Sequence, residues 1–154
     1  LNILSEDLSL LEHKKQVILT PHLKEMSRLL QCTIKEIQEN RVEAIKDFVR
    51  EYPVVCAMKD ARTFVANDEE DIYINTTGNQ SMAKAGAGDV LAGIAVGFLA
   101  QKMTCRGACE TAVYVHGLCG DYVQKEKGSY SVLANDLLDA IGHVMKKLEK
   151  EHTR

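Results

Sequence analysis

Residues 78–101 read GNQSMAKAGAGDVLAGIAVGFLAQ, a glycine-rich loop that runs directly into an apolar segment. Glycine allows positive φ angles and lets a ligand approach the main chain closely. The apolar segment at 90–101 has the length and small side chains of a buried, tightly packed helix. The first N–H groups of a helix lack intrahelical partners and, with the positive end of the helix dipole, bind anions such as phosphate. The pattern predicts an anion site at Gly86, Ala87 and Gly88.

Asp89 stands in the first turn of this predicted helix. A carboxylate there stabilises the helix through its dipole, which is a purely structural role. Beside an anion site it could also accept a proton from a hydroxyl that attacks a phosphoryl group. A plain helix-entry turn would explain a short glycine run equally well. However, a polar loop that leads into a buried helix lies where a cleft meets the core, which favours a functional role.

The remaining segments alternate between strand and helix patterns. Short runs rich in β-branched and aromatic residues predict strands at 16–20, 54–59, 63–67 and 71–75. The acidic turn at 68–71 is expected to join the last two strands as a solvated hairpin. Apolar residues at helical spacing predict helices at 23–40, 42–51, 106–125 and 134–150. With no repeat and no linker, residues 1–154 are interpreted as a single α/β domain.

The composition excludes several classes of protein. The 154 residues are 45% hydrophobic and 27% charged with a net charge of −3, which is typical of a folded globular chain. Acidic and basic residues are interleaved, so no basic stripe suggests nucleic-acid binding. No apolar run reaches transmembrane length and no signal-peptide pattern is present. The sequence begins at Leu1 and not at Met, which is compatible with a processed product or a fragment.

The chain has five cysteines, at positions 32, 56, 105, 109 and 119. An odd number fits poorly with a complete disulfide framework, so a reduced, cytoplasmic protein is expected. Cys105, Cys109, His116 and Cys119 fall near one face of a predicted helix, which raises a metal site as one interpretation. Small buried thiols in helix packing are commoner, and no metal site is predicted.

The glycine-rich loop resembles the closing motif of the NAD(P)H-hydrate dehydratase family, a branch of the ribokinase-like superfamily. That motif runs Gly-Asn-x-x-Met-Ala-x-x-Gly-x-Gly-Asp-x-Leu-x-Gly. The matching residues are Gly78, Asn79, Met82, Ala83, Gly86, Gly88, Asp89, Leu91 and Gly93.

Three further segments are similar to the family. Residues 20–26, Thr-Pro-His-Leu-Lys-Glu-Met, resemble its Thr-Pro-His-Pro-Gly-Glu segment, with Leu23 and Lys24 in place of proline and glycine. Residues 59–63, Lys-Asp-Ala-Arg-Thr, resemble its Lys-Gly-x-x-Thr segment, with Asp60 in place of glycine. A weaker similarity is the helix pattern His116-Gly117 with Gly120-Asp121.

The resemblance implies a ribokinase-like αβα sandwich, of which this chain would be the C-terminal portion. It implies dehydration of the S epimer of NAD(P)H hydrate, with ADP or ATP as phosphoryl donor and Mg²⁺ bridging the phosphates. Asp89 would be the catalytic base and would also contact the substrate, as would His22 and Glu25. The residues implied in nucleotide binding are Lys59, Asp60, Ala61, Arg62, Thr63, Asn79, Gly86, Ala87 and Gly88.

Each role has a structural alternative. Lys59 could be a solvated strand end, His22 a surface histidine, Glu25 a first-turn carboxylate and Asn79 a turn residue. Two other functions remain open: a kinase of the same superfamily acting on a sugar or a vitamin precursor, and a non-catalytic interaction subunit. Members of the family are close to twice this length, so a companion N-terminal half, or a missing segment, is expected. Self-association into a homo-oligomer is also expected.

Overall fold

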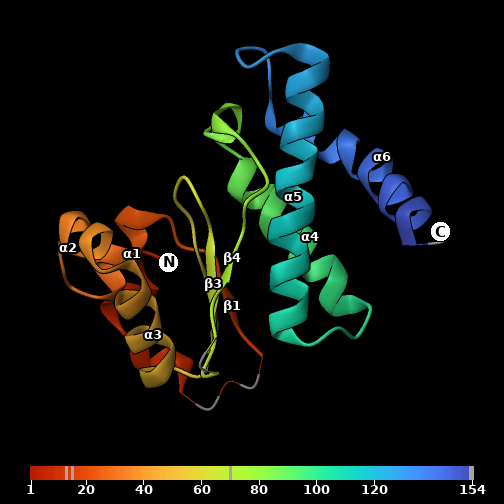
Figure 1. Cartoon of the computed structure of the whole chain (residues 1–154). Coiled ribbons are helices and arrows are strands. Elements are labelled where there is room, and N and C mark those ends of the chain that lie inside the picture. The colour runs from red at the N-terminus through yellow and green to blue at the C-terminus, as the bar shows by residue number, and fades with distance from the viewer. Residues whose placement is uncertain (13, 15, 70, 153–154) are drawn as a thin grey trace. The chain divides into compact units, whose positions relative to one another are not determined.

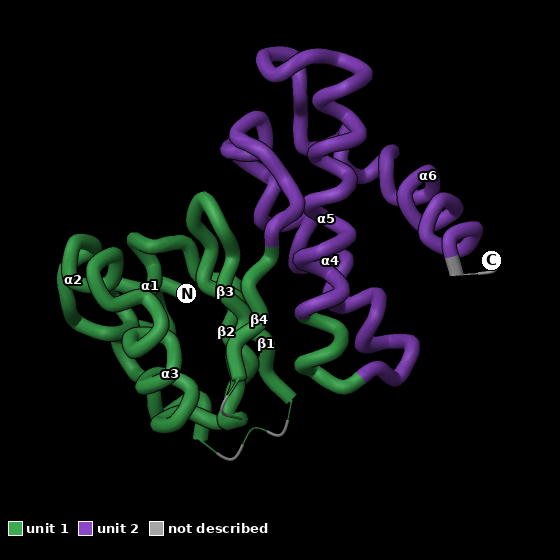
Figure 2. The backbone as a smooth tube through the Cα atoms, in the orientation of Figure 1, with its two compact units in different colours: residues 1–75, 104–109 green, residues 76–103, 110–154 purple. Residues whose placement is uncertain are grey.

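The structure is a computed structural model that describes residues 1–12, 14, 16–69 and 71–152 (Figure 1). The chain divides into two compact units. Residues 1–75 and 104–109 form unit 1, and residues 76–103 and 110–154 form unit 2 (Figure 2). In the described part of the chain, no helix is both long and apolar enough to cross a membrane.

Unit 1 is built on a four-stranded sheet in the order β1-β2-β3-β4. β1 (Ile18–Leu19) pairs parallel with β2 (Val55–Met58), while β3 (Phe64–Ala66) and β4 (Tyr73–Ile74) continue the sheet antiparallel. All four residues of β2 are buried, as expected of a central strand that is apolar throughout. The four predicted strands are therefore confirmed, each shorter than its predicted range.

Three helices cover one face of this sheet: α1 (Leu23–Leu29), α2 (Ile34–Glu39) and α3 (Arg41–Glu51) (Figure 1). Two short 3₁₀ helices, η1 (Leu4–Glu6) and η2 (Leu8–Leu11), precede β1. The core beneath the helices is fully apolar, with Met26, Ile45 and Phe48 among its least exposed side chains. Burial of this amphipathic face is what stabilises such short helices.

The prediction of one continuous helix at 23–40 is wrong. Gln31 has a φ of 52°, in the left-handed region that ends a helix. Thr33 then starts α2 with a capping box, in which its hydroxyl accepts a hydrogen bond from Glu36 N (3.2 Å) and the Glu36 carboxylate accepts one from Thr33 N (2.7 Å). The apolar periodicity carried across this break because both helices bury their apolar faces in the same core.

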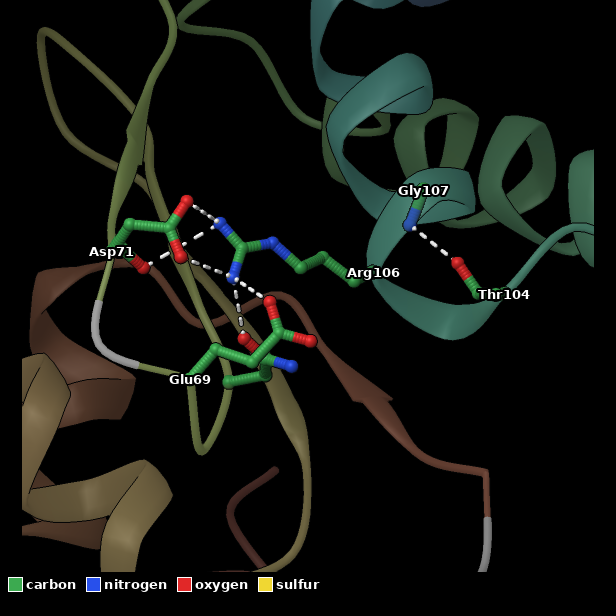
Figure 3. Close-up of polar contacts among 6 residues, drawn as sticks. Glu69, Asp71, Thr104, Arg106 and Gly107 are labelled. Carbon is green, nitrogen blue, oxygen red and sulfur yellow. Dashed lines mark hydrogen bonds and ion pairs between the residues drawn. The ribbon is translucent and has the colours of Figure 1, made fainter.

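The turn between β3 and β4 is held by Arg106, from the first turn of α5 (Cys105–Lys127). Its guanidinium donates to Asn67 Oδ1 (2.8 Å), to Glu69 Oε2 (2.7 Å) and to both carboxylate oxygens of Asp71 (2.8 and 3.0 Å) (Figure 3). The hydrogen bonds from Arg106 lower the pKa of Asp71. The predicted hairpin is confirmed, but its turn is an ion-pair network and not merely a solvated loop. Glu70 lies outside the described residues.

Unit 2 contains η3 (Gln80–Met82), α4 (Ala87–Ala100), most of α5 and α6 (Ala134–His152). These helices confirm the predicted ones to within a few residues, and α4 contacts α6. The expectation that α4 is buried holds for one side of the helix only. Val90, Leu91, Ile94 and Ala95 are buried, whereas Val96 is 63% exposed and Ala92 lies on the same open side. The helix is apolar on all sides, so its sequence could not show which side faces solvent.

Candidate functional site

In unit 1, His22 and Lys59 lie side by side where the parallel strands β1 and β2 end. The two residues form a parallel bridge, and Lys59 N donates a 2.8 Å hydrogen bond to Pro21 O. The Lys59 ammonium also donates to the carbonyl of Thr20. Polar groups at the carboxyl ends of parallel strands are where open α/β sheets bind ligands. The structure thus brings together two residues that are 37 positions apart in the sequence.

His22 is the N-cap of α1. Its Nδ1 accepts a hydrogen bond from Glu25 N (3.1 Å), and Glu25 Oε2 accepts one from His22 N (2.9 Å). Because Nδ1 is an acceptor, the neutral ring carries its proton on Nε2. The side chain is 54% exposed, and its Nε2 lies 3.4 Å from Glu25 Oε2. Leu23, which replaces the family's proline, is the first residue of the helix and packs against the core.

The 59–63 segment follows β2 and turns into β3. Asp60, which replaces the family's glycine, forms an ion pair with Arg41 at the start of α3, with 2.7 Å between the Arg41 Nη2 and Asp60 Oδ2 atoms. Ala61 and Arg62 are exposed. Thr63 O accepts a 2.9 Å hydrogen bond from Asn75 N, which fixes the end of the turn. Asp60 therefore holds this segment onto α3.

In unit 2, the glycine-rich loop delivers an open helix N-terminus. Gly86 has a φ of 87° and no side chain caps α4. A Cβ added at Gly86 would lie 3.1 Å from Ala134 Cβ, whereas one added at Gly88 would meet nothing within 4 Å. Asp89 is exposed in the first helical turn. Gly88 thus has neither a positive φ nor a packing contact that requires glycine, and the space above it is open.

The first half of the loop is held by Asp121, on α5. Its Oδ2 accepts a hydrogen bond from Gly78 N (3.0 Å) and its Oδ1 accepts one from Asn79 Nδ2 (2.9 Å). Asn79 Oδ1 in turn accepts hydrogen bonds from Ser81 N (3.0 Å) and from the Ser81 hydroxyl, and Ser81 is buried. From the sequence, Asp121 has no assigned site role, and its only signal is its place in the pattern at 116–121.

Two glycines of α5 let this loop lie directly on the helix. A Cβ at Gly117 would lie 2.1 Å from Thr77 Oγ1 and 2.7 Å from Thr77 C. A Cβ at Gly120 would lie 2.1 Å from Met82 Sδ. The Thr77 hydroxyl also donates a 3.0 Å hydrogen bond to Tyr114 O. The pattern at 116–121 is thus explained by packing. Gly117 and Gly120 leave room for residues 77–82, and the Asp121 carboxylate accepts hydrogen bonds from them.

Three of the five cysteines, Cys56, Cys109 and Cys119, are buried. All five are described and no disulfide joins them. Burial raises the pKa of Cys56, and it raises the pKa of Cys119 to about 11, so both thiols are protonated at neutral pH. Protonated thiols are poor metal ligands. In the described ranges, no group of three or more His, Cys, Asp or Glu side chains could hold a metal ion.

A family model described as NAD(P)H-hydrate dehydratase matches residues 1–143. The chain belongs to this family. Among curated relatives, the bifunctional NAD(P)H-hydrate repair enzyme of Moorella thermoacetica is 42% identical over 135 residues, covering 88% of this chain and 26% of the relative. The ADP-dependent (S)-NAD(P)H-hydrate dehydratase of Bacillus subtilis is 35% identical over 133 residues, covering 86% of this chain and 48% of the relative.

Solved structures agree with this assignment. A crystal structure of ADP/ATP-dependent NAD(P)H-hydrate dehydratase from Bacillus subtilis, co-crystallised with ATP and Mg²⁺, has a TM-score of 0.82 and 34% identity, covering 86% of this chain and 48% of that one. A ribokinase-like superfamily protein from Enterococcus faecalis has a TM-score of 0.80 and 32% identity, covering 94% of this chain and 49% of that one. The predicted ribokinase-like α/β fold is confirmed. The chain spans about half the length of these two solved structures. It spans 26% of the longer Moorella thermoacetica relative.

Proposed function

We propose that this chain acts in the ADP- or ATP-dependent dehydration of the S epimer of NAD(P)H hydrate to NAD(P)H. The observation that carries the proposal is the glycine-rich loop, which leaves the start of α4 without a side-chain cap and with open space above Gly88. Backbone N–H groups at such a helix start bind phosphate. The family to which the chain belongs supplies the reaction.

The chemistry needs few protein groups because water is a poor leaving group and phosphate is a good one. The hydroxyl oxygen of the hydrate attacks the terminal phosphoryl group of the nucleotide, and its proton passes to the carboxylate of Asp89. The bond from phosphorus to the leaving nucleotide breaks, which gives AMP when ADP is the donor. Loss of a proton and of the phosphate from the ring then yields NAD(P)H. The Gly88 N–H stabilises charge on the transferring group, while the Ala87 N–H donates a 3.3 Å hydrogen bond to the Lys84 carbonyl.

The nucleotide is assigned to Lys59, Asp60, Ala61, Arg62, Thr63, Gly86, Ala87 and Gly88. The resemblance also implies Asn79 as a nucleotide ligand, but its side chain is bonded to Asp121 and Ser81. The ion pair between Asp60 and Arg41 supports an ordered segment at 59–63. Mg²⁺ binds through oxygen ligands and commonly keeps waters and substrate phosphates among them. Asp89 is the nearest carboxylate to the proposed phosphate site along the chain.

His22 and Glu25 are assigned to the hydrated dinucleotide. The imidazole of His22 is half-exposed, and the capping box and the 3.4 Å approach of Nε2 to Glu25 Oε2 hold it in one orientation. Glu25 acts by holding that cap. We further propose that a companion chain or segment equivalent to the rest of the relatives' length completes the domain, since the chain covers 48% of the Bacillus subtilis relative.

The test is a direct assay. The chain, alone and together with a segment equivalent to the rest of the family domain, is incubated with (S)-NADH hydrate, ADP and Mg²⁺, and NADH and AMP are measured. Stoichiometric formation of NADH, AMP and phosphate supports the proposal. Activity of the chain alone contradicts the need for a companion. Phosphorylation of a sugar or a vitamin precursor, with no product from the hydrate, contradicts the proposed function.

A further inference from the structure

We propose that Asp121 and Asn79 form a clamp that positions the glycine-rich loop for the nucleotide, with Asn79 acting as a positioning residue and not as a nucleotide ligand. The inference rests on the proposed function, because it concerns how the same loop is held. It begins from the polar atoms of the Asn79 side chain. Its Nδ2 donates to Asp121 (2.9 Å), and its Oδ1 accepts from Ser81 N (3.0 Å) and from the Ser81 hydroxyl.

The direction of every hydrogen bond in the clamp is determined. A backbone N–H can only donate, so Gly78 N and Ser81 N must each meet an acceptor. An ionised carboxylate only accepts, which forces Nδ2 of Asn79 toward Asp121 and Oδ1 toward Ser81. Hydrogen bonds to a charged acceptor are roughly twice as strong as neutral ones. The clamp therefore specifies one orientation for the Asn79 amide.

The clamp acts on a segment that needs support. Gly78 has a φ of 92° and Gly86 one of 87°, so the loop contains two left-handed glycines eight positions apart. Glycine loses more conformational entropy on ordering than any other residue. If the free protein holds the loop in its binding form only part of the time, apparent affinity falls by that fraction. A clamp from α5 keeps the loop in that form before the nucleotide arrives.

A reciprocal exchange tests the clamp. In Asp121→Asn, residues 79 and 121 both carry amides. Whichever way the two amides are turned, one N–H donor faces another donor: at Gly78 N, at Ser81 N or between the two amides. In Asn79→Asp, two carboxylates face one another. The double variant with both changes restores each bond: residue 121 accepts from Gly78 N and donates to residue 79, whose other oxygen accepts from Ser81. It also has the composition and net charge of the wild type.

The expected result is a rise in the KM for the nucleotide. Each single variant should raise that KM, and the dissociation constant of ATP·Mg²⁺, by roughly tenfold, the effect of one lost hydrogen bond to a charged group. The KM for the hydrate at saturating nucleotide should not change. The double variant should recover nucleotide affinity to within about threefold of wild type. The two single variants and the double variant form a double-mutant cycle, which isolates the coupling between residues 79 and 121. Asp139→Asn, at an exposed position of α6, is the control.

The other outcomes overturn the inference. If Asn79 contacts the nucleotide through its amide N–H, the double variant lacks that donor and stays as weak as Asn79→Asp. If the clamp only stabilises the fold, the single variants melt earlier and nucleotide affinity below the transition is unchanged. A wild-type chain that binds no ATP·Mg²⁺, alone or with a companion segment, overturns the proposed function as well. Wild-type binding without rescue overturns the clamp alone.

Discussion

The backbone N–H of Lys59 donates a 2.8 Å hydrogen bond to the carbonyl of Pro21, and this bond seats Lys59 beside His22. The pair continues the parallel register that begins with Ile18 and Val55. Two side chains assigned to different ligands, the nucleotide and the hydrated dinucleotide, are thus positioned by one strand pairing. The strand pairing orients Lys59, and the helix cap orients His22. The role of each side chain can be tested separately.

Replacing His22 by asparagine should separate its two roles. Asparagine is a good N-cap, so His22→Asn should keep the stability of α1 while removing the imidazole. The KM for the hydrate should rise more than the KM for ADP. His22→Ala loses the cap as well and should lower the free energy of unfolding by about 1 kcal/mol. Steady-state kinetics and thermal melting measure these effects. Equal kinetics for wild type and His22→Asn would remove His22 from the substrate site.

Gly86 and Gly88 should respond differently to alanine. Gly88→Ala meets no protein atom within 4 Å and should stabilise the helix by about 0.5–1 kcal/mol. It should also raise the nucleotide KM by roughly tenfold or more, because a methyl group would keep phosphate from the amide. Gly86 has a φ of 87°, and an added Cβ would lie 3.1 Å from Ala134 Cβ. Gly86→Ala should therefore lower the free energy of unfolding by at least about 1 kcal/mol. A stable Gly88→Ala variant with normal nucleotide affinity would place the phosphates elsewhere.

Asp89→Asn should abolish most of the turnover without unfolding the protein. The amide keeps the size of the side chain, which is exposed, but cannot accept the hydroxyl proton. The kcat should fall by roughly 10²–10⁴-fold, the usual contribution of a general base. Thermal melting and nucleotide titration serve as controls and should change little. Normal kcat in this variant would refute the assignment of Asp89 as the base.

The network around Arg106 should make stability depend on pH. Hydrogen bonds from Arg106 lower the pKa of Asp71, so folded Asp71 binds its proton more weakly than the unfolded chain does. The resulting stabilisation is complete above the ordinary aspartate pKa of about 3.9 and disappears as the pH falls through the lowered value. Asp71→Asn should melt earlier at neutral pH and show a smaller loss on acidification. Asp68→Asn, an exposed neighbour, is the control, and an identical pH profile for both variants would contradict the argument.

The packing of the loop on α5 predicts a contrast between glycines. Gly117→Ala would place a Cβ 2.7 Å from a backbone carbon of Thr77, which cannot move without shifting the loop. Overpacking of this kind costs about 1–3 kcal/mol. Gly142→Ala, on α6, meets nothing within 4 Å and should stabilise by up to about 1 kcal/mol. Chemical denaturation measures both, and a Gly117→Ala variant as stable as Gly142→Ala would contradict the described packing.

The sequence by itself determined the features that local chemistry encodes. Apolar spacing located the strands and most helices, because burial selects a period of two or 3.6 residues. The glycine-rich loop and Asp89 were found because glycine and a first-turn carboxylate have local meanings at a helix start. The break at Gln31 was missed, although Thr33 and Glu36 form a recognisable capping box, since apolar residues continue on both sides.

Only the tertiary structure decided the pairings between distant residues. Arg106 meets Asp71 across 35 positions, Lys59 meets Thr20 across 39, and Asp121 meets Asn79 across 42. Sequence spacing specifies which residues share a face of one element, but it does not specify which faces of two elements meet. Those contacts depend on how the chain packs its core, where many weak apolar contacts act together. Asp121 therefore belonged to a recognisable sequence pattern, while its role followed from the fold.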